Sequence, residues 1–198
     1  MRKLIAAILF FGFLTVSLGA CLTEAQGEEN MKKAVMIIAH DNFRDEEFLE
    51  PAEILEKNGI EVKVASSKLG PAKGKLGAMV KPDMLLKEVN VKDFDAVVFI
   101  GGNGASEYWD DPIAHNLAQE AYNSGKVVAA ICIAPVTLAR AGVLKGKKAT
   151  VWSSEGEQLK QLGADYTGNP VERDGKIITA AGPFAAKDFG EEIVKALK

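Results

Sequence analysis

The sequence predicts a three-layer α/β domain, in which a mainly parallel sheet lies between two layers of helices. One observation is a series of short, largely apolar runs, such as residues 34–39 and 95–100, which are typical of strands buried on both faces. Another is that these runs alternate with amphipathic segments of helical length, such as residues 112–123. Strands that alternate with helices in this way predict parallel pairing with helices on both faces of the sheet.

The first half of the pattern runs from a strand at residues 34–39 to a helix over 46–58, which has apolar residues at helical spacing and ends at Asn58-Gly59. Pro51 interrupts this pattern, so we expect the helix to start late or to kink. A second strand follows at 60–65. Residues 68–81 are dense in glycine and lysine, which predicts an exposed excursion rather than a core element.

In the second half, strands and helices continue to alternate. The sequence shows no internal repeat and no second domain. Gly101-Gly102 ends the strand at 95–100, and Ser124-Gly125 ends the helix over 112–123. The final pair of strands is expected to turn at Arg173-Asp174-Gly175. The further strands are expected at 127–131 and 148–152, with a hairpin over 171–180. The further helices are expected at 135–141, 155–162 and 184–197.

Composition narrows the class of protein. The 198 residues are 47% hydrophobic and 26% charged, which disfavours long disorder and a polytopic membrane protein. A net charge of −3 disfavours a nucleic-acid partner. Two cysteines cannot form a disulfide framework, and no His/Cys/Asp cluster has metal-ligand spacing. We therefore expect no metal and no other cofactor.

The N-terminus has the pattern of an export signal. Arg2 and Lys3 precede an apolar run at residues 4–16 and small residues up to Cys21, which predicts a signal peptide at 1–20. Leu18-Gly19-Ala20-Cys21 resembles a bacterial lipobox, so Cys21 is the expected site of lipid attachment, and residues 21–31 form a polar tether to the domain at 32–198. The alternative is an uncleaved anchor over residues 4–22. Either way, we expect an exported protein tethered to the cell envelope.

Cys132 is the first candidate site residue. It lies where the strand at 127–131 meets the following helix, with Ala130 and Ala134 two residues away on either side. A nucleophile elbow needs this order and these small neighbours, and the helix dipole is expected to lower the pKa of the thiol. The alternative is a buried structural cysteine, which is equally common for this pattern.

Two other segments follow strands at the same edge of the sheet, where sites of such folds form. Gly101-Gly102-Asn103-Gly104 lacks the last glycine of a dinucleotide loop, so it is either a turn with positive φ or an oxyanion hole made by the amides of Gly102 and Ile133. Of Asp45-Glu46-Glu47, two carboxylates are expected to face solvent at a helix start. The third would fold inward with a raised pKa and donate a hydrogen bond to the thiolate.

Together these segments resemble the ThiJ/PfpI superfamily, which includes the parkinsonism-associated deglycase, glyoxalase III-type enzymes and PfpI-type peptidases. The resemblance covers nearly all of residues 32–198 and rests on FRDEEFLEP, FIGGNGASEYWDDP, AAICIAPVTLARAGVLKGKKAT and DGKIITAAGP. It implies a flavodoxin-like fold similar to the class I glutamine amidotransferase domain. It also implies a reactive cysteine at Cys132, a conserved glutamate at Glu47, oxyanion amides at Gly102 and Ile133, and homo-oligomers, either dimers or hexamers.

The chain departs from the family pattern at its histidines. PfpI-type peptidases have a histidine directly after the cysteine, where this chain has Ile133, and the deglycase histidine is absent near residues 151–153. His40 could approach the site, but a plain loop histidine is the favoured interpretation, and His115 is expected at the surface. Without a Cys-His pair, the peptidase hypothesis is weak. Three aromatic residues are candidates for a pocket or interface, with ordinary partial burial as the alternative: Tyr108, Trp109 and Trp152.

The resemblance and the residues together predict a cofactor-free, stress-protective enzyme that acts on small reactive carbonyls such as methylglyoxal. The Cys132 thiolate would add to the aldehyde, and Glu47 would shuttle a proton between adjacent carbons. One alternative is a redox-sensing or holdase-like stress protein with an oxidisable cysteine. Another is a binding protein that keeps the fold with a vestigial site.

Overall fold

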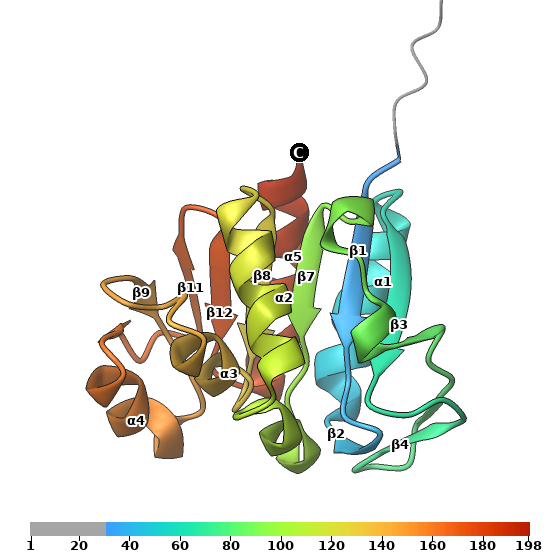
Figure 1. Cartoon of the computed structure of the whole chain (residues 1–198), viewed down its shortest axis with the longest axis horizontal. Coiled ribbons are helices and arrows are strands. Elements are labelled where there is room, and N and C mark those ends of the chain that lie inside the picture. Colours follow the sequence, from blue (N-terminus) through green and yellow to red (C-terminus); the bar gives the residue numbers. More distant parts are fainter. Residues whose placement is uncertain (1–30) are drawn as a thin grey trace, which may run out of the picture. The chain divides into compact units, whose positions relative to one another are not determined.

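The computed structural model describes residues 31–198, which form a seven-stranded central sheet with helices on both faces (Figure 1). The strand order is β11-β12-β8-β7-β1-β3-β6, and all neighbours are parallel except β11 and β12. The strands of this sheet are β1 (Lys33–Ile37), β3 (Glu61–Ser66), β6 (Met84–Leu85), β7 (Ala96–Phe99), β8 (Val127–Ile131), β11 (Val171–Asp174) and β12 (Ile177–Ala180).

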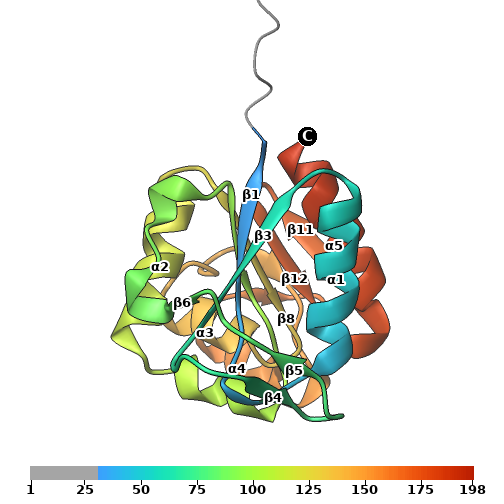
Figure 2. The ribbon, with the colours of Figure 1, turned by 90° about the vertical axis from the view of Figure 1, so that its right-hand side faces the viewer.

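Successive residues of the central strands point to opposite faces, and each face has its own hydrophobic cluster. On β1, Ala34 and Met36 join the cluster that also contains α1 (Asp45–Lys57) and α5 (Ala186–Leu197). Val35 and Ile37 join the cluster beneath α2 (Pro112–Asn123), α3 (Pro135–Arg140) and α4 (Gly156–Gln161). Figure 2 shows α2 on one side of the sheet and the α1–α5 pair on the other. The predicted three-layer α/β architecture is confirmed.

The described residues also form two small sheets and several short 3₁₀ helices outside the central sheet. Two small sheets are formed by β2 (Asp41–Phe43) with β4 (Ala72–Gly74) and β5 (Met79–Val80), and by β9 (Lys148–Ala149) with β10 (Asp165–Tyr166). Short 3₁₀ helices are η1 (Leu86–Glu88), η2 (Val91–Asp93), η3 (Asn103–Tyr108), η4 (Ser153–Glu155) and η5 (Pro183–Ala185).

The strand predicted at 148–152 is wrong in length and in place. Only Lys148 and Ala149 are extended in a ladder, and they pair with β10 rather than with the central sheet. Beyond them the backbone leaves the ladder, because the N–H of Thr150 donates to the Thr179 hydroxyl (2.9 Å) and the N–H of Trp152 donates to the carbonyl of Cys132 (2.8 Å). The segment that resembles a strand therefore continues into the loop beside Cys132.

The expectation that Pro51 delays the first helix is also wrong. Helix α1 begins at Asp45 and continues through Pro51 to Lys57. Acidic residues occupy its first turn, where they interact favourably with the helix dipole. Pro51 is buried against α5 at Gly190, where a β-carbon would lie only 2.9 Å from the Pro51 Cα. The close packing of the two helices thus stabilises a residue that would break a solvated helix.

Smaller differences concern short elements. The excursion at 68–81 is mostly exposed, as predicted, but it contains β4 and β5 and buries Ala72. The last hairpin turns at Gly175 and Lys176, slightly later than expected. No helix within residues 31–198 has the length and apolarity needed to cross a membrane. The predicted signal peptide, Cys21 and the tether up to residue 30 lie outside the described residues.

Candidate active site

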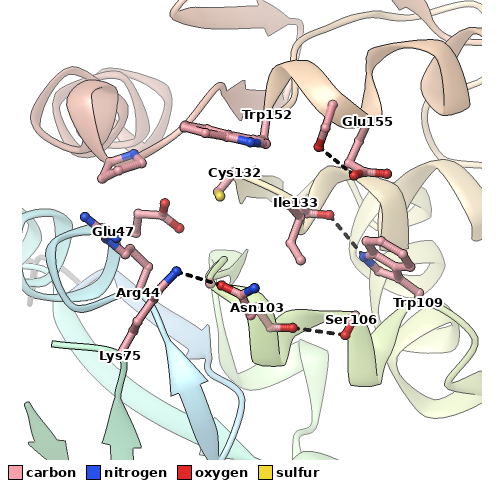
Figure 3. A pocket seen from close by; sticks show the side chains of 13 residues that line it. Arg44, Glu47, Lys75, Asn103, Ser106, Trp109, Cys132, Ile133, Trp152 and Glu155 are labelled. Carbon is pink, nitrogen blue, oxygen red and sulfur yellow. Dashed lines mark hydrogen bonds between the residues drawn. The ribbon is translucent and has the colours of Figure 1, made fainter. Parts of the chain in front are cut away.

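The loops that follow β1, β7 and β8 surround a cavity of about 540 Å³ at the carboxyl edge of the sheet (Figure 3). These three strands are neighbours in the sheet, so the three segments singled out from the sequence come together there. Glu47, Gly102, Cys132 and Ile133 all line the cavity.

Cys132 lies on a strained turn between β8 and α3. Its φ is +64°, a left-handed conformation that is unusual for a residue with a side chain. Both of its backbone groups are held: the N–H donates to the Ala180 carbonyl (2.9 Å), and the carbonyl accepts from Trp152 (2.8 Å). Ala130 and Ala134 are buried on either side. This is the backbone geometry of a nucleophile elbow, and the side chain points into the cavity.

The glycine loop brings backbone donors to the sulfur. Gly102 has φ +95°, and the backbone N–H groups of Gly102 and Ile133 lie near enough to the Cys132 thiol to lower its pKa. Gly101 has no room for a side chain, because a β-carbon there would collide with the Glu47 carboxyl and with the Cys132 Cβ. The loop therefore needs positive φ at Gly102 and close approach at Gly101, and it brings the Gly102 amide to the same side of the cavity as the Ile133 amide, the pair expected to form an oxyanion hole.

Glu47 is the inward carboxyl. Its side chain comes from the first turn of α1, has no exposed surface and points toward Cys132 (Figure 3). Neither carboxyl oxygen has a partner with regular hydrogen-bond geometry, although the group lies against the thiol. Burial raises the pKa of Glu47 from 4.5 to about 7, with smaller lowering effects from the thiol and from Arg44.

The expected fall in the pKa of the thiol is wrong. Burial, followed by the charge of Glu47, raises the pKa of Cys132 to about 12, and the amides of Gly102 and Ile133 only partly oppose this rise. Helix α3 starts at Pro135 and ends at Arg140, so it is short and begins beyond the thiol. Glu47 thus loses its proton before Cys132 does, and the pair consists of a neutral thiol beside a carboxyl that ionises near neutral pH.

Of the other residues singled out from the sequence, some line the cavity and others do not. Trp152 lines the cavity and is 40% exposed. His40 does not line it, and its Nδ1 lies 3.3 Å from the carboxylate of its neighbour Asp41. Tyr108 is a core residue whose hydroxyl donates to the Ile38 carbonyl (2.9 Å).

The wall formed by Trp109 is held by polar contacts. Its indole N–H donates to the Ile133 carbonyl (3.2 Å), next to the oxyanion amide, and the Arg140 guanidinium lies 5.3 Å from its ring centre. His115 is half-buried rather than on the open surface, because its Nε2 lies 2.7 Å from the Trp109 carbonyl. Trp109 therefore helps to fix the loop that carries Ile133.

Two features of the site had no signal in the sequence. Asp45 was expected to face solvent, yet it is 5% exposed and accepts hydrogen bonds from the N–H groups of Leu76 (2.8 Å) and Ala78 (2.7 Å). This contact brings Lys75, from the exposed excursion, to the cavity beside Arg44. Only tertiary packing joins these segments. Within residues 31–198, no group of three or more His, Cys, Asp or Glu side chains is arranged to hold a metal ion.

Comparisons of the sequence and of the structure with known proteins point to the same family. The model of the DJ-1/PfpI family matches residues 32–196. A crystal structure of a ThiJ/PfpI domain protein from Brachyspira murdochii has a TM-score of 0.82 and 36% sequence identity, covering 83% of this chain and 95% of that one.

Similar sequences include proteins with and without a named activity. An uncharacterized protein of Methanocaldococcus jannaschii is 44% identical, over 99% of this chain and 98% of the relative. A protein of Pyrococcus abyssi named a deglycase is 35% identical, over 83% of this chain and 99% of the relative. A glutathione-independent glyoxalase of Caenorhabditis elegans is 28% identical, over 84% of this chain and 89% of the relative.

Proposed function

The chain belongs to the DJ-1/PfpI family, and on that premise we propose that it is a cofactor-free, cysteine-dependent enzyme that protects against small reactive carbonyls such as methylglyoxal. Relatives named deglycase and glyoxalase support an enzymatic role of this kind. The observation that carries the proposal is that the Cys132 side chain and the buried Glu47 carboxyl lie side by side in the cavity, against Gly101 of the glycine loop.

The first step is addition of the thiol to the aldehyde. Ionised Glu47 takes the proton of Cys132 as the sulfur attacks the carbonyl carbon, so a free thiolate need not accumulate. A carboxyl with a pKa of about 7 suits this role, since a general base works best when its pKa is near the working pH. We expect the amides of Gly102 and Ile133, which both line the cavity, to donate to the developing oxyanion, and the proton on Glu47 then completes the hemithioacetal.

The second step moves a proton between adjacent carbons. Ionised Glu47 removes the proton from the former aldehyde carbon, and the electron pair moves to form an enediolate. Return of the proton to the neighbouring carbon gives a thioester, so the aldehyde carbon is oxidised and the ketone carbon is reduced. Water then cleaves the thioester to the hydroxy acid and restores the thiol. The sequence consumes one water and needs no external oxidant or reductant.

The alternatives have less support. The PfpI-type peptidases have a histidine directly after the cysteine, where this chain has Ile133, and neither His40 nor His115 lines the cavity. A redox sensor relies on a low-pKa, accessible thiol, whereas burial raises the pKa of Cys132. Removal of early glycation adducts would use the same residues as the carbonyl reaction.

The test is formation of hydroxy acid from methylglyoxal and glyoxal by the purified full chain, kept reduced, beside Cys132→Ser and Glu47→Gln. A protein-free sample corrects for spontaneous loss of aldehyde, and His40→Gln is the matched control outside the cavity. We expect both site variants to lose turnover and the control to keep it. Absence of turnover in the reduced wild type, or turnover that survives Cys132→Ser, would contradict the proposal.

The N-terminal sequence supports a separate proposal about location. We propose that the protein is exported and that Cys21 carries a lipid that tethers it to the envelope. Labelling of cells with a radioactive fatty acid, with Cys21→Ser as the comparison, tests this: label retained by the variant would refute it. We also propose self-association, which light scattering of the purified protein would measure.

A further inference from the structure

The cavity is larger than the simplest substrates require. Its volume of about 540 Å³ lies in the range of pockets that hold drug-sized ligands, whereas methylglyoxal has only a few heavy atoms. Much of the cavity wall therefore lies beyond the reacting carbonyl. The side chains of that wall can contact another part of a larger substrate.

One wall of the cavity carries two positive charges. Lys75 and Arg44 lie on the same side of Cys132, and Glu155 lies across the cavity from them (Figure 3). The Lys75 ammonium donates to the Asn103 side-chain oxygen (3.0 Å), a neutral partner, and within residues 31–198 it has no carboxylate within 4.0 Å. Arg44 is different, because its Nε and Nη2 already bind Glu46 (2.8 and 3.0 Å). Lys75 is thus the cation available to an anionic ligand.

The position of Lys75 is fixed by buried groups. Its N–H donates to the Phe43 carbonyl (2.8 Å), and the buried Asp45 carboxylate accepts hydrogen bonds from the N–H groups of Leu76 and Ala78, one and three residues further along the chain. Asp45 and Glu47 are both in the first turn of α1. The helix that carries the buried carboxyl therefore also sets the distance from that carboxyl to the lysine.

We propose that Lys75, assisted by Arg44, selects carbonyl substrates that carry a carboxylate, and that Asp45 is the positioning residue for Lys75. The substrate carboxylate would accept a hydrogen bond from the Lys75 ammonium, while its aldehyde reaches the Cys132 sulfur. Glu155, on the far wall, would repel a carboxylate there and so favour this one orientation. This inference rests on the proposed function only in that the substrate reacts at Cys132.

Alkylation of Cys132 tests the charge preference without any turnover. The probes are iodoacetate, which carries a carboxylate, and iodoacetamide, its neutral analogue of nearly equal size. The full chain is labelled at mildly alkaline pH, and modification is counted by mass spectrometry on the tryptic peptide 127–140, which contains Cys132 and not Cys21. The measured quantity is the ratio of the two labelling rates.

The variants are Lys75→Met, Asp45→Asn and the control Lys73→Met. Lys73 lies two residues before Lys75, in β4, is exposed and does not line the cavity, and its replacement changes the net charge equally. We expect Lys75→Met to lower the iodoacetate-to-iodoacetamide ratio about two- to fivefold, the value of a partly exposed ion pair. Asp45→Asn should lower it in the same direction, Lys73→Met should not, and added salt should reduce the effect.

A ratio that is unchanged in Lys75→Met, or lowered equally by Lys73→Met, would overturn the inference. The raised pKa of Cys132 slows both reagents alike, so it does not alter their ratio. A second experiment compares the turnover of two 2-oxoaldehydes. One is 4,5-dioxovalerate, which carries a carboxylate at its far end, and the other is its uncharged analogue 2-oxopentanal. A Lys75-dependent labelling ratio without turnover of either compound would refute the proposed function and keep the charge preference. Equal turnover of both, with no labelling preference, would refute the charge preference alone.

Discussion

Replacement of Glu47 by glutamine should stabilise the folded protein at neutral and alkaline pH while it removes activity. The wild-type side chain has no exposed surface, and its carboxyl oxygens have no regular hydrogen-bond partner, so its charge is costly to bury. Burial raises the pKa from 4.5 to about 7, and a shift of this size corresponds to about 3 kcal/mol. Glutamine has nearly the same shape and carries no charge at any pH.

The sign of the pH dependence follows from the two pKa values. Below pH 4.5 the carboxyl is protonated in both the folded and the unfolded chain, so the stability of the wild type is full there. Between 4.5 and about 7 the unfolded chain loses the proton and the folded chain keeps it, so the free energy of unfolding falls as pH rises. Above about 7 the whole contribution is lost.

The assay is urea unfolding followed by circular dichroism at a series of pH values, with wild type and Glu47→Gln side by side. The stability advantage of the variant should grow by about 3 kcal/mol between acid and alkaline solution. Glu46→Gln is the matched control, because the hydrogen bonds from Arg44 lower the pKa of Glu46. Replacing this carboxylate should therefore destabilise the protein above the pKa of Glu46, the opposite of the effect expected for Glu47→Gln. A difference between wild type and Glu47→Gln that does not change with pH would refute the argument.

Three further outcomes are expected from the same geometry. In Glu47→Gln the pKa of the Cys132 thiol should fall but stay above its ordinary value, because burial is the larger cause of its rise; the ultraviolet absorbance of the thiolate against pH measures this. Gly101→Ala should reduce turnover about 100-fold or more, since the added methyl would displace both Glu47 and Cys132, while far-ultraviolet circular dichroism stays native. Asp45→Ala should cost about 2 kcal/mol of stability, because two backbone N–H groups lose their acceptor, and unchanged urea unfolding would contradict this.

The sequence was sufficient for the central strands and for the cluster around Cys132. Buried parallel strands such as β7 and β8 are apolar throughout, and the loops that follow them must meet at one edge of the sheet. The positions of Cys132 and Gly102 follow from that rule and from short motifs next to the strands, whereas the choice of Glu47 among three acidic residues came from the family resemblance. Each of these signals is local in sequence, which is why it could be recognised.

What the sequence did not predict depends on contacts between distant segments. Asp45 is indistinguishable from its acidic neighbours until the turn at 74–78 folds over it. The pKa of Cys132 depends on how deeply the thiol is buried and on the charge beside it, and a motif contains neither quantity. Residues 150–152 have the composition of a strand, but their hydrogen bonds go to Thr179 and Cys132 instead of a ladder.

The order of the central strands also determines how the candidate active site comes apart when the protein is heated. Cys132, the glycine loop and the segment leading to Glu47 follow β8, β7 and β1, three adjacent strands in the interior of the sheet. Interior strands exchange their amide hydrogens only in the rarest, most extensive openings, whereas edge strands and surface turns open often. Fraying at β6 or β11 can therefore occur many times without separating the thiol from its carboxyl. Heat inactivation should accordingly coincide with cooperative unfolding of the whole domain, and residual activity should report the fraction of intact molecules.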